Sequence, residues 1–389
     1  MALPLAGVRV LDFLHFIAGP FAPTLLAYAG ADVIKIEPPE GETPRTFGPM
    51  LRGESTRYLA WNPGKRSLAV DLKQPEGREI IERLLPSTDV LVENFRVGVM
   101  ERLGFGYTRL QHQYPRLIYC AVTAYGSTGP YAHKPGFDPL AQALSGIIAR
   151  HGGGGNSPKY YLGAPTDYGC AILAAYGIAL ALFARRRTGR GQRVDTSLLH
   201  TAVAMQAGSF LRAADANTLT AASGLVPYQV FATADRWIFV GVETDGQWQQ
   251  LCHVLDLPAL GADVRFRSNA DRVVEREVLL PQLAVRFQMQ AAHEWLNRLE
   301  AVNIPCAPVQ SLKEVGADPR LLEAGWQTHV QHPTLGLLRM LSSPVHFSAE
   351  PSPVYLPAPL LGQHTEAILQ ELGYTAKDLS DLRATRVVV

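Results

Sequence analysis

One acidic residue and a group of arginines flank the longest apolar stretch of the sequence. Asp167 lies just ahead of the apolar run at 170–184, and four arginines follow within 185–190. Aspartate carboxylates are among the side chains that form covalent intermediates with reactive acyl groups. The same placement also has a purely structural explanation, because an acid at the start of a helix and bases at its end both complement the helix dipole. Spacing alone leaves both explanations open.

A glycine cluster lies a few residues ahead of Asp167. The segment HGGGGNSP at 151–158 follows a helical pattern. Glycine-rich stretches usually form flexible connections, and near a reactive residue they also form lids that close over a site. We keep both interpretations of this segment.

Four widely spaced cysteines show no CxxC pairing. Such spacing argues against a disulfide framework and against a thiolate metal site. We expect reduced cysteines in the core and no bound metal; the four positions are Cys120, Cys170, Cys252 and Cys306.

Short β-branched segments alternate with helical patterns through the first part of the chain. This alternation is typical of a parallel α/β sheet. Helices are predicted between the strands, with Pro20 near one helix start and the segment at 75–85 opening with proline and acidic residues. The expected strands are 8–13, 32–37, 67–72, 89–95 and 117–122.

The first half is therefore Rossmann-like in outline, yet it lacks the signature of a dinucleotide site. The turn after the first predicted strand reads HFIAGPF instead of GxGxxG. The pyrophosphate of a dinucleotide needs those glycines for close approach of the backbone. We expect a different ligand.

The sequence pattern changes between about residues 224 and 322. Two strand-like runs surround a predicted turn at Ala234 and Asp235, and helical segments follow. We predict a large Rossmann-like domain from 1–200 and 330–389, discontinuous in sequence, and a smaller α+β domain at 225–325. The predicted linkers are 201–224 and 326–329.

Composition excludes several classes of partner. The 389 residues are 47% hydrophobic and 18% charged, with a formal net charge of +1. This balance gives no reason to expect nucleic acid or an anionic membrane as partner. The N-terminal segment has no basic leader before an apolar stretch and reads as a first strand, so we expect a cytoplasmic protein.

Six segments in order resemble the class III CoA-transferase family, which includes formyl-CoA transferase and carnitine CoA-transferase. The stretch around Asp167 resembles the family's aspartate, apolar helix and TGRGQ segment at 188–192. The similarity extends over nearly the whole chain. The matching segments are 11–41, 62–79, 89–107, 124–146, 304–319 and 358–373.

The resemblance implies that Asp167 is the catalytic residue. In this chemistry a carboxylate attacks an acyl-CoA thioester to give a mixed anhydride, and the released thiolate converts the anhydride to an aspartyl-CoA thioester. An acceptor carboxylate then reverses both steps. CoA is a substrate here, so the resemblance implies no prosthetic group and no metal; the expected partners are an acyl-CoA and a small organic acid, for example a dicarboxylic acid.

The resemblance also implies contacts with CoA. It places them at His15, Ile17, Val70, Leu72, Lys73, Asn94, Phe95 and Arg102. Lys134 and Arg45 are weaker candidates for a phosphate or a substrate carboxylate. Each of these residues has an ordinary structural explanation as well, as a core, turn or solvated surface residue.

Three positions depart from formyl-CoA transferase. Ile17 replaces a polar amide residue near the reacting groups, which disfavours oxalate and formate as substrates. Pro38 replaces an arginine that contacts the nucleotide, so other cations must hold the phosphates. Pro135 aligns with a lysine, and the neighbouring Lys134 is the candidate replacement.

Two other functions compete with CoA transfer. The 2-methylacyl-CoA racemases share most motifs, but their α-proton exchange needs two acid/base groups, and they have a histidine where this chain has Phe137. His133 and His151 keep that alternative open. A CoA-binding protein without turnover is the third possibility, although a pure binder has no use for Asp167.

The family resemblance further implies an interlocked homodimer. In this architecture two ring-like subunits, each with a large and a small domain, thread through each other. Periodicity by itself supports only the α/β first half and the change of pattern near residue 224.

Overall fold

The computed structural model describes residues 2–151, 157–210, 224–348 and 355–389. The chain forms two compact units. Unit 1 combines Met1–Leu211 with Leu322–Val389, and unit 2 is Arg212–Leu321. The predicted linker segments overlap regular elements, since 201–204 belong to a helix and 327–329 to a strand. Most of the glycine cluster, 152–156, lies outside the described residues.

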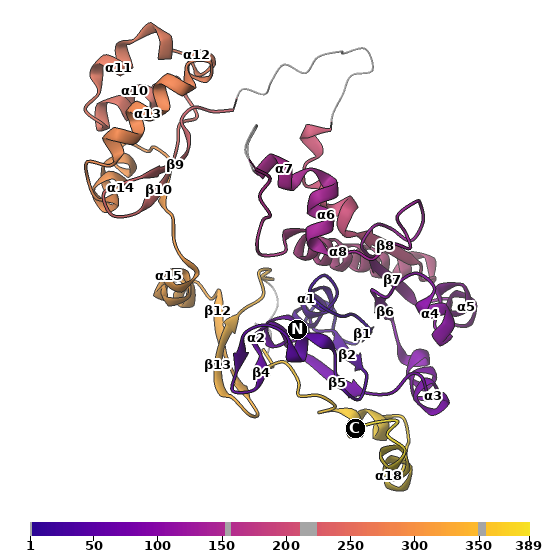
Figure 1. Ribbon diagram of the computed structural model, residues 1–389. Coiled ribbons are helices and arrows are strands. Elements are labelled where there is room, and N and C mark those ends of the chain that lie inside the picture. The colour runs from indigo at the N-terminus through magenta and orange to yellow at the C-terminus, as the bar shows by residue number, and fades with distance from the viewer. Residues whose placement is uncertain (1, 152–156, 211–223, 349–354) are drawn as a thin grey trace. The chain divides into compact units, whose positions relative to one another are not determined.

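Unit 1 is built on a six-stranded parallel sheet (Figure 1). Every neighbouring pair of strands in this sheet is parallel. The five predicted strands are present, and a sixth strand follows α8. In spatial order they are β5 (Lys65–Ala69), β2 (Asp32–Glu37), β1 (Arg9–Asp12), β6 (Val90–Glu93), β7 (Ile118–Thr123) and β8 (Arg193–Ser197).

The order in which strands are added to the sheet reverses between β1 and β6. Strands added first lie on one side of β1, and strands added later lie beyond β6. In open parallel sheets of this kind, ligands bind at such a switch point, outside the carboxyl ends of the strands. The topology therefore indicates a site among the loops after β1, β6 and β7.

Alternating side chains of the strands enter two separate cores. Val10 packs on one face of the sheet with Ala22 and Cys170, whereas Leu11 packs on the other face with Ile80. A strand that is buried on both faces needs apolar residues at successive positions. This explains the continuous apolar runs at the predicted strands. The first face is covered by α1 (Phe21–Tyr28) and α8 (Pro165–Thr188), and the second by α3 (Pro75–Leu84), α4 (Val99–Leu103), α5 (Tyr107–Gln113), α17 (Thr365–Glu371) and α18 (Ala376–Ala384).

Helix α8 is the apolar helix expected after Asp167. It begins with Pro165, which suits the first helical position, and ends at Thr188, where Gly189 with φ +67° caps its C-terminus. Asp167 thus lies within its first turn. By length and composition α8 is apolar enough to cross a membrane, but its buried side chains pack on the sheet, as in the core helix of an α/β domain.

The C-terminal segments return to the first unit. A hairpin of β12 (Gln327–His332) and β13 (Gly336–Leu341) precedes α17 and α18. Val388 forms a bridge with Val70, and residues of α17 and α18 complete the core beside α3. The smaller elements of this unit are η1 (Thr43–Thr46), β3 (Met50–Leu51), β4 (Glu54–Ser55), α2 (Thr56–Trp61), η2 (Leu85–Ser87), α6 (Asp138–Ser145), α7 (Ile147–His151), α9 (Leu198–Ala204) and η3 (Ala207–Ser209).

Unit 2 has its own core around Trp248 and Trp295. Its antiparallel sheet has the order β11-β10-β9, and the turn predicted at Ala234 and Asp235 joins two of these strands. The elements are β9 (Tyr228–Ala232), β10 (Trp237–Gly241), α10 (Asp245–Val254), α11 (Pro258–Ala262), η4 (Val264–Phe266), α12 (Asn269–Val274), α13 (Arg276–Phe287), α14 (Ala292–Glu300), β11 (Cys306–Pro308) and α15 (Leu312–Ala317), with α16 (Pro319–Glu323) at the boundary. All four cysteines are free, and three of them are buried.

Candidate functional site

A pocket of about 650 Å³ opens at the carboxyl ends of β1, β6 and β7 in unit 1. Its lining includes 15–18 after β1, 94–97 after β6 and 122–125 at the end of β7. This volume lies within the usual range for small-molecule sites. The pocket stands at the switch point of the sheet, where the topology predicts a ligand.

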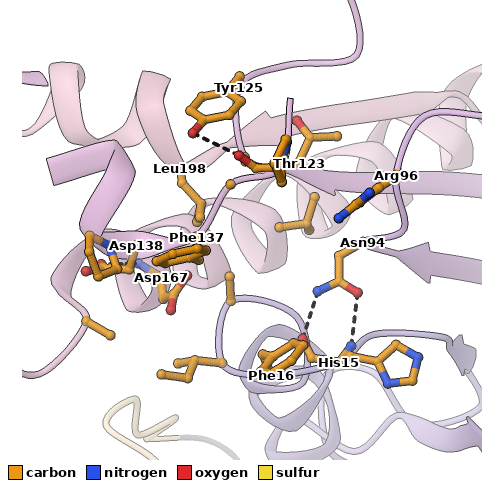
Figure 2. Close-up of a pocket in the computed structure, with 18 of the residues that line it drawn as sticks. His15, Phe16, Asn94, Arg96, Thr123, Tyr125, Phe137, Asp138, Asp167 and Leu198 are labelled. Carbon is orange, nitrogen blue, oxygen red and sulfur yellow. Dashed lines mark hydrogen bonds between the residues drawn. The ribbon is translucent and has the colours of Figure 1, made fainter. Parts of the chain in front are cut away.

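Asn94 joins two of these loops. Its side-chain amide donates to the carbonyl of His15 at 2.8 Å, and its side-chain oxygen accepts from the backbone N–H of His15 at 3.0 Å (Figure 2). Gly19 permits this approach, because a side chain there would meet the Asn94 amide at 3.0 Å and Leu14 at 2.5 Å. The two loops therefore form one rigid wall of the pocket.

Asp167 lies in the first turn of α8 and lines the pocket. The neighbouring backbone donors are occupied by a second carboxylate, that of Asp138 in α6. One oxygen of Asp138 accepts from the backbone N–H of Thr166 at 2.8 Å and of Asp167 at 3.2 Å, and also from the Thr166 hydroxyl. Gln142 donates to the other oxygen. Asp138 thus caps α8 in place of a residue from the helix itself.

This arrangement raises the pKa of Asp167 to about 7. Burial is the larger cause, and the nearby negative charge of Asp138 adds to it. Within the part of the chain that the structure describes, no donor forms a hydrogen bond with the Asp167 carboxylate. A carboxylate so poorly stabilised is more basic than an ordinary aspartate, and it ionises near neutral pH.

Asp167 and Asn94 stand on opposite sides of the pocket. Figure 2 shows Asp167 beside Asp138 and Phe137, with Asn94, His15 and Arg96 on the other side. A ligand in this space would reach the carboxylate at one end and the loop after β6 at the other. Three cationic side chains line the pocket as well, those of Arg57, Arg96 and Lys134.

A buried ion pair between Glu42 and Lys35 lies next to the His15 ring. The Glu42 carboxylate lies 3.4 Å from His15 Nδ1 and 3.0 Å from Lys35 Nζ, and both Glu42 and Lys35 side chains are fully buried. Burial opposes the charged form of Glu42, but Lys35 and His15 outweigh it and lower the pKa of Glu42 to about 2. A negative charge that persists at neutral pH therefore faces the His15 ring.

The pocket brings together six of the ten residues proposed from sequence for catalysis and CoA binding. These are His15, Ile17, Asn94, Phe95, Lys134 and Asp167. The other four do not line it: Val70 is buried in the core, Leu72 packs against that core, and Lys73 and Arg102 are exposed outside the pocket.

Arg45 has a structural role. It forms a bidentate ion pair with Glu37 at 2.7 Å and stacks over the ring of Tyr58 at 3.7 Å. These groups occupy its guanidinium, so Arg45 does not line the pocket.

The histidines that would suit a racemase lie elsewhere. His133 is exposed and does not line the pocket, and His151 packs against the ring of Tyr161. Phe137, for which the family resemblance implies a histidine in the racemases, does line the pocket. Among the described lining residues, His15 is the one histidine, on the side opposite Asp167 (Figure 2).

Sequence reasoning missed three charged residues of the pocket. Asp138 reads in sequence as a first-turn acid of its own helix, and no local signal connects it with α8. Arg57 and Arg96 read as ordinary charged residues. Arg96 stands beside the Asn94 and Phe95 pair, which was the one available signal for it.

Comparisons with known proteins agree on one family. Residues 5–365 match CoA-transferase family III. The chain is 37% identical over 393 residues to succinyl-CoA:glutarate CoA-transferase of Homo sapiens, covering 99% of this chain and 90% of the relative. It is 33% identical over 398 residues to succinyl-CoA–D-citramalate CoA-transferase of Chloroflexus aurantiacus, covering 99% and 98%.

A solved structure has the same fold. It is a CAIB/BAIF family protein from Brucella suis, 32% identical, with a TM-score of 0.85 over 96% of this chain and all of that one. Sequence and structure thus point to the same group of enzymes along nearly the full length. The chain belongs to CoA-transferase family III and is an enzyme of that class.

Proposed function

We propose that this enzyme moves CoA from the thioester of one short dicarboxylic acid to the free carboxylate of another, with Asp167 as the covalent carrier. The observation that carries the proposal is the position of Asp167. Its carboxylate lines a pocket of suitable size, carries no hydrogen bond from the described residues and has a pKa raised to about 7.

The proposed reaction exchanges one anion for another at each step. An Asp167 oxygen attacks the thioester carbonyl, the carbon–sulfur bond breaks and CoA leaves as thiolate. The thiolate then attacks the aspartyl carbonyl of the anhydride, and the donor acid leaves as carboxylate. The acceptor carboxylate attacks the aspartyl-CoA thioester, and the released thiolate attacks the acceptor carbonyl. This last step frees Asp167 and the new acyl-CoA.

The surroundings of Asp167 suit both roles that the proposal assigns to it. A more basic carboxylate is a better nucleophile, and the ionised form is available at neutral pH because the pKa is about 7. Asp138 already takes the backbone donors of Thr166 and Asp167. The nucleophile is therefore not weakened by hydrogen bonds from its own helix.

The loop after β6 supports the CoA end of the proposal. Asn94, Phe95 and Arg96 line the pocket on the side away from Asp167, and Lys134 adds a further positive charge. Cations of this kind bind phosphates, and the Phe95 ring offers an apolar surface for the pantetheine arm. Contacts of Val70, Leu72, Lys73 and Arg102 with the nucleotide remain predictions from the family resemblance.

The names of the relatives support dicarboxylic substrates. The human relative is a succinyl-CoA:glutarate transferase, and the Chloroflexus aurantiacus relative is a succinyl-CoA–D-citramalate transferase. Both names contain succinyl-CoA as the CoA thioester. We propose succinyl-CoA as the first donor to test, with glutarate as acceptor.

Incubation with succinyl-CoA and glutarate in deuterated water separates the competing functions. We expect glutaryl-CoA to form and no deuterium to enter the α-carbon of the thioester, because Phe137 cannot transfer a proton. Mass spectrometry measures both quantities in one sample. Deuterium uptake without exchange of the acyl group would establish a racemase, and binding of succinyl-CoA without either change would establish a CoA-binding protein.

We also propose a homodimer, in the interlocked form that the family resemblance implies. One face of α8 is apolar and exposed, with exposed fractions of 54% at Ile172, 60% at Tyr176, 49% at Leu180 and 64% at Phe183. These positions form a single stripe along the helix, and contiguous exposed apolar stripes mark contact surfaces.

Phe183→Glu is expected to shift the protein from dimer to monomer, because it places a charge in this stripe. Sedimentation velocity measures the change. Leu312→Glu in unit 2 is the control, since Leu312 is 92% exposed and lies outside this stripe. An unchanged dimer in the Phe183 variant would remove α8 from the proposed subunit contact. A cytoplasmic location remains our prediction, which fractionation of the source cells would test.

A further inference from the structure

Arg57 is placed near the proposed carrier by the short helix α2. The indole N–H of Trp61 donates to the hydroxyl of Tyr168 at 3.0 Å, and Tyr168 directly follows Asp167 in α8. Arg57 and Trp61 stand at positions i and i+4 of α2, so their side chains share one face of that helix. Both side chains line the pocket together with Asp167.

The side chain of Arg57 is held along a defined path. Its guanidinium lies 4.5 Å from the centre of the Phe47 ring. Its aliphatic stem passes over Gly48, where any side chain would meet Arg57 Cδ at 2.8 Å and Nε at 2.9 Å. The Arg57 side chain thus lies between the Phe47 ring and Gly48. This position limits its rotamers.

Arg57 has no counterion among the described residues. No acidic side chain there forms an ion pair or a hydrogen bond with it, in contrast to Arg45, which Glu37 neutralises. The groups that accompany it in the lining are largely aromatic and apolar, including Phe47, Trp61 and Phe137. An uncompensated cation in such surroundings is a strong recognition element for an anion.

Arg57 and Asp167 both influence the ionisation of one residue of the pocket, Tyr160. Tyr160, also in the lining, has a raised pKa, first because of burial and then because of Asp138 and Asp167, while Arg57 opposes the shift. The Tyr160 hydroxyl therefore lies within electrostatic reach of both Asp167 and Arg57. An acyl group attached at Asp167 has access to the pocket that Arg57 and Tyr160 also line.

We propose that Arg57 binds the distal carboxylate of the acyl group that Asp167 carries, and that it thereby selects short dicarboxylic acids over monocarboxylic acids of the same length. This inference rests on the proposed function. A second carboxylate could not enter an apolar lining without a partner, because an unpaired buried charge is costly. Arg96 stands near Asn94 on the side away from Asp167 (Figure 2), where the phosphates of CoA are the better match.

The test compares two thioesters with the same four-carbon acyl chain, succinyl-CoA and butyryl-CoA. The rate of covalent adduct formation is measured in single turnover, by rapid quenching and intact-protein mass spectrometry, so that no acceptor acid is involved. In Arg57→Gln we expect the preference for succinyl-CoA over butyryl-CoA to fall about tenfold or more, the size expected for loss of a charge-assisted bond. The succinyl-CoA rate should fall more than the butyryl-CoA rate, because butyryl-CoA has no distal carboxylate.

Two further variants test whether the guanidinium of Arg57 is the cause of the preference for succinyl-CoA. Arg57→Lys keeps the charge but loses the planar fork, so it should retain part of the preference. Arg52→Gln is the matched control, because Arg52 is an exposed arginine nearby that does not line the pocket, and it should leave the preference unchanged.

The outcomes separate this inference from the proposed function. If the parent enzyme forms no adduct with either thioester, the proposed function fails and this inference fails with it. If the parent enzyme reacts and Arg57→Gln keeps its preference for succinyl-CoA, or loses both rates equally, only the role of Arg57 is overturned.

Discussion

Asp167→Asn should abolish CoA transfer while leaving the binding of acyl-CoA nearly unchanged. Asparagine has the shape of aspartate but cannot form the anhydride, so we expect kcat to fall at least ~1000-fold. Steady-state transfer assays measure the loss, and calorimetric titration with succinyl-CoA measures the affinity. Asp381→Asn, an exposed change on α18, is the matched control and should have no effect.

The stability of Asp167→Asn shows whether its loss of transfer comes from the missing carboxylate or from misfolding. The folded-state pKa of Asp167, about 7, is raised above the ordinary aspartate value. Its contribution to stability is therefore present at low pH and is lost as the pH rises toward and through 7. Above pH 7 the folded protein must hold an ionised carboxylate in a buried site, which lowers its stability. Asparagine carries no charge and removes this cost. Thermal unfolding of Asp167→Asn at pH 8 should therefore occur at the same temperature as in the parent enzyme or higher. Transfer that survives at more than a few per cent would exclude Asp167 as the carrier.

Changes at Asp138 should alter both the rate and its pH dependence. In the parent enzyme, kcat/KM for succinyl-CoA should rise about tenfold per pH unit up to about pH 7 and then level off, because only the ionised Asp167 attacks. Asp138→Asn removes one of the two causes of the raised pKa. The inflection should therefore move to lower pH, yet stay above the value of an ordinary aspartate, because burial remains.

Asp138→Ala goes further, since it also removes the cap of α8. The backbone donors of Thr166 and Asp167 lose their acceptor, which we expect to cost about 1–3 kcal/mol of stability. Displacement of the first turn should lower kcat/KM by about 100-fold. A pH–rate profile and chemical denaturation measure the two effects.

The control for Asp138 is a capping aspartate remote from the pocket. Asp378 accepts hydrogen bonds from the N–H and hydroxyl of Thr375 at the start of α18. Asp378→Asn should lower the stability modestly and leave the pH inflection in place. If the inflection in Asp138→Asn coincides with that of the parent enzyme, Asp138 does not tune the nucleophile.

Local pattern was sufficient for five of the six strands in the parallel sheet of the first unit. The strands begin and end within a few residues of the predicted ranges, because parallel strands buried on both faces leave short, nearly continuous apolar runs in the sequence. The sequence placed Asp167 just ahead of the long apolar helix, whereas α8 begins at Pro165 and includes Asp167 in its first turn. Only the family resemblance assigns Asp167 a catalytic role, because spacing alone favours its structural explanation at the start of a helix.

Only the tertiary structure decided which polar groups meet. Asp138 reaches Asp167 because α6 and α8 pack in the same region of the unit, and His15 reaches Asn94 because β1 and β6 are neighbours although far apart in sequence. Arg45 and Arg57 look alike in sequence, but Glu37 neutralises one of them and Trp61 sets the other near the carrier. The physical reason is that periodicity records which face of an element is buried, whereas the charge state and reach of a polar side chain depend on neighbours that the fold brings from elsewhere in the chain.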